Sequence, residues 1–185
     1  HKTFNMPNRR QFIQDTAKAS AAVYIAGMGF SAKSYGRIIG ANDRIRVGAI
    51  GFSDRFRQTL FPCFSNHYKE LNFDFVAVSD IWSKRREEGV AFLKEKIGHD
   101  IIGYRNNEEL YASKNVDAVF VATSDFQHAL HAIEAVKAGC DAYVEKPFAE
   151  TMEDNRAALK AIKATDRIVQ IGSQRRSGTN YIAAD

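Results

Sequence analysis

The sequence is poor in cysteine, and this scarcity excludes several classes of protein. Its 185 residues include only two cysteines, Cys63 and Cys140, and they form no CxxC pair. Two cysteines do not make a disulfide framework, and a cysteine zinc site is unsupported without closely spaced pairs. A chain of this length can bury a sizeable core without disulfides, so we expect both cysteines to be plain buried thiols.

Long hydrophobic runs are also missing. No stretch approaches the roughly 18 consecutive apolar residues that a transmembrane helix needs. Hydrophobic residues nevertheless make up 45% of the chain, a share that is typical of globular proteins. The composition therefore predicts one globular domain of ordinary size, with no membrane span.

Positive charge is unevenly distributed along the chain, whose formal net charge is +4. Residues 1–46 contain eight Lys/Arg and two acidic residues, whereas residues 47–185 contain eighteen basic and twenty acidic residues. The basic character therefore belongs to the N-terminal segment. A nucleic-acid-binding domain would concentrate positive charge on its own body, so we expect no nucleic-acid partner.

The N-terminal segment has the composition of an export signal. Residues 8–14 carry adjacent arginines before Phe-Ile, an apolar stretch of small residues runs from Ala19 to Phe30, and residues 32–34 form a small-x-small site. A charged region, a short apolar region and a small cleavage site are the parts of a secretory signal, and the arginine pair resembles the twin-arginine type. We predict an export leader and linker over residues 1–43, and a periplasmic or secreted protein. The alternative is an amphipathic first helix over residues 9–26.

The rest of the chain alternates short apolar runs with longer helical stretches. Runs rich in Val, Ile and Phe predict buried parallel strands at residues 44–50, 73–79, 116–122, 141–145 and 168–172, with a weaker one at 101–104. Helices are predicted at residues 83–97, 126–138 and 151–164. This alternation predicts an α/β fold, a doubly wound parallel sheet of the Rossmann-like type, over residues 44–176.

The turn after the first predicted strand is a candidate phosphate site. A dinucleotide-binding turn has the pattern G-x-G-x-x-G, and here Gly51 holds the first glycine position, Ser53 the second and Phe56 the third. A helix N-terminus binds phosphate through its free N–H groups, and the Ser53 hydroxyl and the Arg55 charge can add to it. Gly51, Ser53, Asp54 and Arg55 are therefore predicted cofactor contacts. The alternative is an ordinary strand–helix turn without a ligand.

An acidic residue at the end of the second predicted strand supports the same site. Asp80 is placed to accept hydrogen bonds from the adenosine ribose, and its charge favours NAD over NADP. Basic residues at 84–86 soften that preference, and Trp82 is either a stacking partner for adenine or a packing aromatic. Gly51 and Asp80 are 29 residues apart, more than the usual ~20, so we predict an insertion in the first crossover.

Two further segments carry a family resemblance. Residues 122–128 read Ala-Thr-Ser-Asp-Phe-Gln-His after the fourth main strand, and residues 145–147 read Glu-Lys-Pro after the fifth. In this order on such a sheet, they resemble the glucose–fructose oxidoreductase / inositol dehydrogenase (Gfo/Idh/MocA) family. The resemblance covers about residues 44–176, which correspond to the family's N-terminal domain.

The resemblance implies roles for particular residues. Thr123 and His128 match positions near the cofactor, and Glu145 matches a residue that packs against the cofactor region. Pro147 matches a proline that shapes the turn, where a cis peptide bond is possible. Lys146 matches the family's catalytic lysine, beside the nicotinamide and the reacting hydroxyl. A lysine there can accept the hydroxyl proton, and in protonated form it can stabilise alkoxide charge.

The resemblance also implies a second, α+β substrate domain that is absent from this chain, with its start at residues 177–185. Homo-oligomerisation is expected through that domain. Arg175 and Arg176 follow the last predicted strand, where substrate contacts are expected, although a solvated basic loop is equally consistent. A metal site shared by His128 and His131, three residues apart, lacks an evident third ligand, and we predict no metal.

The sequence is consistent with three functions. The first is an exported oxidoreductase that transfers a hydride between a nicotinamide cofactor, NAD rather than NADP, and a sugar or cyclitol hydroxyl. The second is a glycoside hydrolase of the same family, acting through transient oxidation on a retained NAD. The third is a binding protein without cofactor, suggested by Ser53 and Phe56 at the glycine positions.

Overall fold

The structure is a computed structural model that describes residues 44–68 and 70–174. The predicted leader over residues 1–43, the predicted start of a second domain at 177–185, and Arg175 and Arg176 lie outside the described residues. Within the described ranges, no helix is long and apolar enough to cross a membrane.

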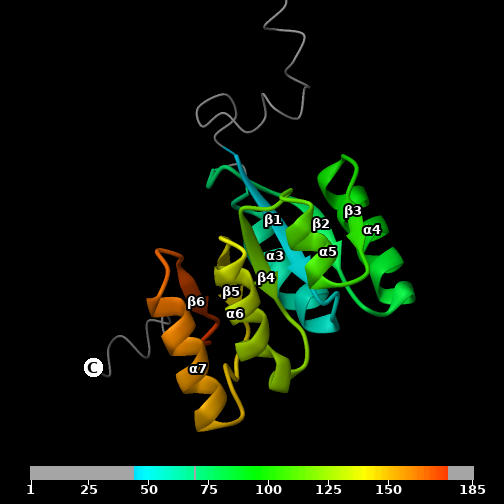
Figure 1. Cartoon of the computed structure of the whole chain (residues 1–185). Coiled ribbons are helices and arrows are strands. Elements are labelled where there is room, and N and C mark those ends of the chain that lie inside the picture. Colours follow the sequence, from blue (N-terminus) through cyan, green and yellow to red (C-terminus); the bar gives the residue numbers. More distant parts are fainter. Residues whose placement is uncertain (1–43, 69, 175–185) are drawn as a thin grey trace, which may run out of the picture. The chain divides into compact units, whose positions relative to one another are not determined.

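A six-stranded parallel sheet forms the centre of the domain (Figure 1). The strands are β1 (Ile45–Ile50), β2 (Phe73–Ser79), β3 (Ile102–Tyr104), β4 (Ala118–Val121), β5 (Asp141–Val144) and β6 (Val169–Ile171). Their order is β3-β2-β1-β4-β5-β6, and every neighbouring pair is parallel. The predicted doubly wound sheet is thus confirmed. Its order reverses between β1 and β4, which opens a crevice at the carboxyl ends of these strands.

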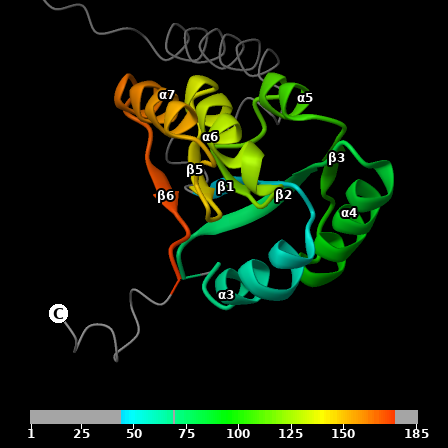
Figure 2. The same cartoon turned by 90° about the horizontal axis from the view of Figure 1, so that it is seen from below.

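Helices cover both faces of the sheet. The chain forms the π-helix η1 (Phe56–Leu60), α3 (Phe61–Ser65), α4 (Ser83–Ile97), α5 (Asn107–Ala112), the 3-10 helix η2 (Asp125–Gln127), α6 (His128–Lys137) and α7 (Met152–Lys163). Figure 2 shows α5, α6 and α7 on one face, and α3 and α4 on the other. Two apolar cores result, one on each face, because successive strand residues point in opposite directions.

Local sequence signals account for where the helices begin and end. The side chain of Thr151, the first residue of the predicted helix 151–164, accepts a hydrogen bond from the backbone N–H of Asp154 and caps α7. Gly139 follows α6 with a φ of 81°, a left-handed conformation that favours glycine. The helix α4 and the strand β2 match their predicted bounds, whereas the other five strands are one to three residues shorter than predicted because pairing ends before the apolar runs do.

The first crossover departs from the common pattern because of Phe56. The ring at the third glycine position is completely buried and lies 5.9 Å from Phe52 and 5.6 Å from Phe75, measured between ring centroids. A glycine there would let helix and strand pack closely, whereas this aromatic cluster fills the space between them. The helical segment runs over residues 54–65 and includes the π-helix η1.

The first crossover, where an insertion is predicted, contains this helical segment and the turn that follows it. Pro62 lies within the helical segment, just after the π-helix η1, and residues 66–68 form a turn at its end. The cysteines also differ from expectation. Cys140 is buried but Cys63 is exposed, since it lies on the outer side of α3 while Phe61 faces the core. The prediction of two buried thiols is wrong for Cys63.

Candidate dinucleotide site

The turn after β1 has a conformation that only glycine accommodates. Gly51 has a φ of 80°, and its N–H donates to the carbonyl of Ser79 at 2.8 Å. A Cβ at this position would lie 2.8 Å from Cγ2 of Thr123 and 3.0 Å from the carbonyl oxygen of Ala122. The first position of the predicted glycine pattern is therefore required by the backbone and by its neighbours.

Ser53 begins the helix that follows this turn. Its hydroxyl oxygen accepts the N–H of Phe56 at 3.2 Å, and its carbonyl accepts the N–H of Arg57 at 3.0 Å. The N–H groups of Asp54 and Arg55 precede this first intrahelical bond, so they belong to the helix end that attracts anions. Serine replaces the second glycine here as a helix cap.

Asp80 connects the glycine turn to the segment that follows β2. One carboxylate oxygen accepts the N–H of Phe52 at 3.0 Å, and the other accepts the N–H of Trp82 at 2.9 Å. The guanidinium of Arg86 donates to the carbonyl of Asp80 at 2.8 Å. These bonds hold the carboxylate at the edge of the crevice, where the sequence places a ribose acceptor.

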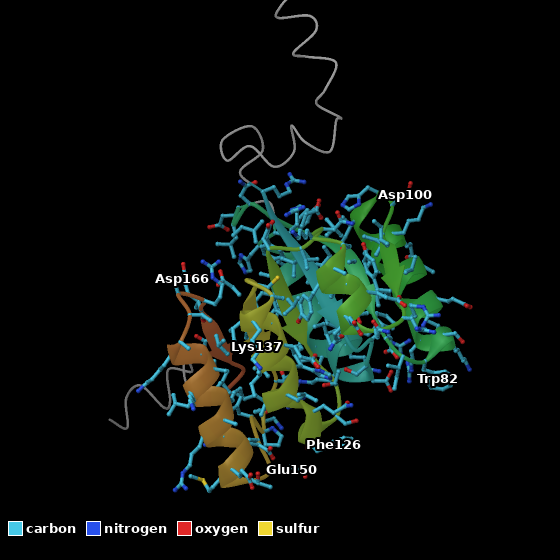
Figure 3. The ribbon with its side chains drawn as sticks, in the orientation of Figure 1. Trp82, Asp100, Phe126, Lys137, Glu150 and Asp166 are labelled. Carbon is cyan, nitrogen blue, oxygen red and sulfur yellow. The ribbon has the colours of Figure 1, made fainter. Side chains whose placement is uncertain are left out.

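A pocket of about 620 Å³ opens at this edge. Its walls come from the ends of β1, β2 and β4 together with α5 and α6, and they include Gly51, Ser53, Asp54, Asp80, Trp82, Arg85, Asn107, Thr123, Gln127, His131 and Glu134. The structure therefore brings together five of the predicted cofactor residues: Gly51, Ser53, Asp54, Asp80 and Thr123. Figure 3 shows Trp82 and Phe126 at the end of the domain that lies opposite Asp100.

Thr123 supplies an independent sign that this pocket suits a ligand. Its hydroxyl oxygen is buried and has no hydrogen-bond partner among the described residues. A buried hydroxyl without a partner is unfavourable, and native proteins seldom leave one unsatisfied. Together with the helix N-terminus and Asp80, this hydroxyl fits a dinucleotide, whose phosphates and ribose supply acceptors and hydroxyls.

A second group of predicted residues forms the neighbouring turn after β5. His128 is buried, and its two ring nitrogens lie 2.7 Å from the carbonyl oxygen of Pro147 and 3.2 Å from that of Thr123. The histidine thereby links the turn after β4 to the turn after β5. The Lys146–Pro147 peptide bond is cis. His131 contacts other partners on α5 and α6, so the two histidines do not face a common centre.

An ion pair between the partly exposed Arg55 and the buried Glu145 joins this turn to the glycine turn. Glu145 is 3% exposed, and one of its carboxylate oxygens accepts from Nη2 of Arg55 at 2.9 Å and from Nε at 3.1 Å. The other oxygen accepts the N–H of Lys146 at 3.2 Å. With its amide turned to place the oxygen toward Arg55, Gln174 accepts from both terminal nitrogens of that guanidinium at 3.0 and 3.2 Å. Burial and then the Glu145 carboxylate raise the pKa of Tyr143 on β5.

This network changes the expected position of Arg55. The sequence suggests that its charge faces a phosphate, but the structure directs the guanidinium to Glu145, 90 residues away in the chain. Lys146 is exposed, and it is not among the described residues that line the pocket. The predicted site thus divides into a pocket that fits the adenosine and phosphates, and an adjoining turn that carries Lys146.

The sequence-based prediction missed several polar residues of the pocket wall, among them Asn107, His131 and Glu134. Asn107 begins α5, and Glu134 and His131 lie along α6, where all three border the pocket. Their positions in the sequence could have indicated a place at the pocket. Asn107 follows the third strand, and polar residues after parallel strands gather at the ligand edge of such sheets. His131 and Glu134 lie one and two turns beyond the start of α6, where the helical period keeps them on one side.

The fold and this pocket define a dinucleotide-binding domain of the Rossmann type. Residues 45–173 match the model of the oxidoreductase family with an NAD-binding Rossmann fold. The chain therefore belongs to the Gfo/Idh/MocA oxidoreductase family, as its sequence resemblance implied.

Curated relatives agree with this assignment. An inositol 2-dehydrogenase of Agrobacterium fabrum is 35% identical over 145 residues, which cover 75% of this chain and 40% of that protein. An inositol 2-dehydrogenase/D-chiro-inositol 3-dehydrogenase of Halalkalibacterium halodurans is 34% identical over 111 residues, covering 58% of this chain and 30% of the relative. The chain thus spans less than half the length of these relatives.

A solved structure shows the same fold. The WlbA dehydrogenase of Bordetella pertussis, in complex with NADH and UDP-GlcNAcA, matches with a TM-score of 0.66 and 22% identity over 76% of this chain and 39% of that chain. At this identity the likeness concerns the fold alone.

Proposed function

We propose that this chain is the cofactor-binding part of an exported oxidoreductase that acts on a cyclitol or sugar hydroxyl with NAD. The observation that carries the proposal is the pocket at the reversal of the strand order, which contains Asp80 and a Thr123 hydroxyl that no described residue pairs. His128 connects the turn of Thr123 to the turn that carries Lys146. The identity to inositol 2-dehydrogenases supports a cyclitol as the substrate class.

Different residues of the chain would bind the cofactor and transfer the proton in such a reaction. Bound NAD would accept a hydride from the carbon that bears the hydroxyl. Gly51 and the helix N-terminus after it would bind the phosphates, and Asp80 would hold the ribose. Lys146 would take the proton from the substrate hydroxyl, while Glu145 and His128 position the turn on which it lies.

The first experiment adds NAD and myo-inositol to the full-length enzyme, which includes the predicted substrate domain, and follows the absorbance of NADH. We expect NADH to form, and we expect NAD to bind at least about tenfold more tightly than NADP, because the Asp80 carboxylate repels a 2′-phosphate. Trp82, the single tryptophan of the chain, lines the pocket, so its fluorescence reports binding directly. Failure of NAD to change this fluorescence or to bind in calorimetry would favour a binding protein without cofactor.

An assay with a glycoside distinguishes the glycoside hydrolase, the second candidate function, from the dehydrogenase. If the protein releases an aglycone from a glycoside with retained NAD and without net NADH, the glycoside hydrolase is correct and the dehydrogenase is not. Formation of NADH in proportion to oxidised cyclitol gives the opposite result. Homo-oligomerisation through a second domain stays a prediction.

Export is proposed on the sequence alone. The support comes from the arginine pair at residues 9 and 10 and the apolar stretch of small residues that follows. In bacteria that express the protein with residues 6–185, we expect fractionation to recover it outside the cytoplasm. A variant with Arg9 and Arg10 replaced by lysine should stay in the cytoplasm. Equal export of both forms would exclude the twin-arginine route.

A further inference from the structure

The pocket has a polar wall that the proposed chemistry does not use. It consists of Asn107, His131 and Glu134, and hereafter we call these three residues the polar wall. Asn107 comes from α5 and the other two from α6.

Hydrogen bonds hold the polar wall in one arrangement. Oε2 of Glu134 lies 2.9 Å from Nδ2 of Asn107, which donates to it, and 2.9 Å from Nδ1 of His131. Oδ1 of Asn107 accepts the hydroxyl of Ser79 at 2.8 Å. Ser79 is the last residue of β2 and immediately precedes Asp80, so the wall is anchored beside the proposed ribose acceptor.

One oxygen of the Glu134 carboxylate remains available. The contacts with Asn107 and His131 both use Oε2, and no described residue donates a hydrogen bond to Oε1. The Glu134 side chain is 36% exposed and borders the pocket, whereas that of His131 is 12% exposed. The wall therefore offers an incoming ligand a charged acceptor whose position is already set.

The covalent order of a dinucleotide determines which of its groups meets this wall. The phosphates belong at the turn after Gly51 and the ribose at Asp80, so the base occupies the part of the pocket beyond Asp80. Trp82, at the start of α4, and the polar wall, on α5 and α6, both line this pocket. Trp82 is 56% exposed, and a purine ring against it would cover apolar surface.

We propose that Glu134 selects the base of the dinucleotide by accepting a hydrogen bond from the exocyclic amine of adenine. This inference rests on the proposed binding of NAD in the pocket. In a base with a carbonyl in place of the amine, the carbonyl oxygen and the Glu134 carboxylate would both be acceptors. The carboxylate would then lose water without gaining a hydrogen-bond donor. The chain would thus discriminate among dinucleotides by their base.

The test measures the affinities of NAD and of nicotinamide hypoxanthine dinucleotide, which differ at this amine, by calorimetry with the 185-residue chain. For the unaltered protein we expect NAD to bind roughly tenfold or more tightly, the loss typical of one hydrogen bond to a charged group. In Glu134→Gln, whose amide can accept from adenine or donate to hypoxanthine, we expect the two affinities to agree within about threefold.

A matched control removes the same charge elsewhere. Glu87 is exposed on α4 and does not line the pocket, so Glu87→Gln should keep the preference for NAD. Equal affinities of the unaltered protein for the two dinucleotides would overturn the inference while leaving NAD binding intact. The inference is equally wrong if Glu134→Gln weakens both dinucleotides by the same factor. Absence of any NAD binding would instead contradict the proposed function.

Discussion

In the full-length enzyme, replacing Lys146 with alanine is expected to lower the rate of NADH formation from a cyclitol by at least about 100-fold, since a positioned acid–base group contributes roughly 10²–10⁴ to a rate. NAD affinity should change by less than about threefold, because the side chain is exposed and lies outside the pocket that fits the adenosine and phosphates. Steady-state rates and calorimetry on the same preparation measure the two quantities. A loss in kcat with an intact cofactor site distinguishes a role in the reaction from a role in folding.

Lys137→Ala serves as the matched control for this prediction. Lys137 is an exposed lysine at the end of α6 and does not line the pocket, so its removal should leave both quantities unchanged. An unchanged rate in Lys146→Ala would remove this lysine from the mechanism. A parallel loss of NAD affinity would show that the substitution disturbs the cofactor site instead.

Replacing Arg55 with methionine is expected to lower the free energy of unfolding by about 3 kcal/mol, because the substitution leaves the Glu145 carboxylate buried without its cation. The Glu145 side chain is 4% exposed and that of Arg55 33%, so little water can compensate the carboxylate. Unfolding in urea, followed by circular dichroism, measures the difference. NAD affinity should fall as well, since Arg55 connects the glycine turn to the turn that carries Lys146.

Two further variants test whether the unpaired Glu145 carboxylate causes the loss of stability in Arg55→Met. In Arg55→Met combined with Glu145→Gln, most of the lost stability should return, because the second substitution removes the unpaired charge. Arg57 pairs with Asp54 at the surface, so Arg57→Met should cost less than about 1 kcal/mol. If the double variant is as unstable as the sum of the single variants, the ion pair does not explain the effect of Arg55.

Much of the fold follows from patterns that act over short distances in the chain. Apolar runs of five to seven residues, separated by helices, can be buried only as parallel strands with helices on both faces. The same holds for the ends of elements, where Thr151 caps α7 and Gly139 follows α6. The limits of strands were less predictable, because pairing with a neighbour ends a strand and apolar character does not.

Within the candidate site, the sequence predicts the positions of those residues that lie in the turns at strand ends. Gly51 and Asp80 follow directly from their positions at strand ends. The partner of Arg55 was not predictable, because a guanidinium pairs as readily with a phosphate as with a carboxylate, and only packing selects between them. The burial of Phe56 also depends on the cluster formed by Phe52 and Phe75.

By itself, the sequence determined the sheet, the glycine turn and the family, because backbone conformation and hydrophobic periodicity are properties of neighbouring residues. The tertiary structure alone decided that Arg55 pairs with Glu145 and that Asn107, His131 and Glu134 meet at one wall of the pocket. These contacts join residues from 24 to 90 positions apart, apart from the local His131–Glu134 pair. Their partners are chosen by how the layers pack, and no local pattern encodes that choice.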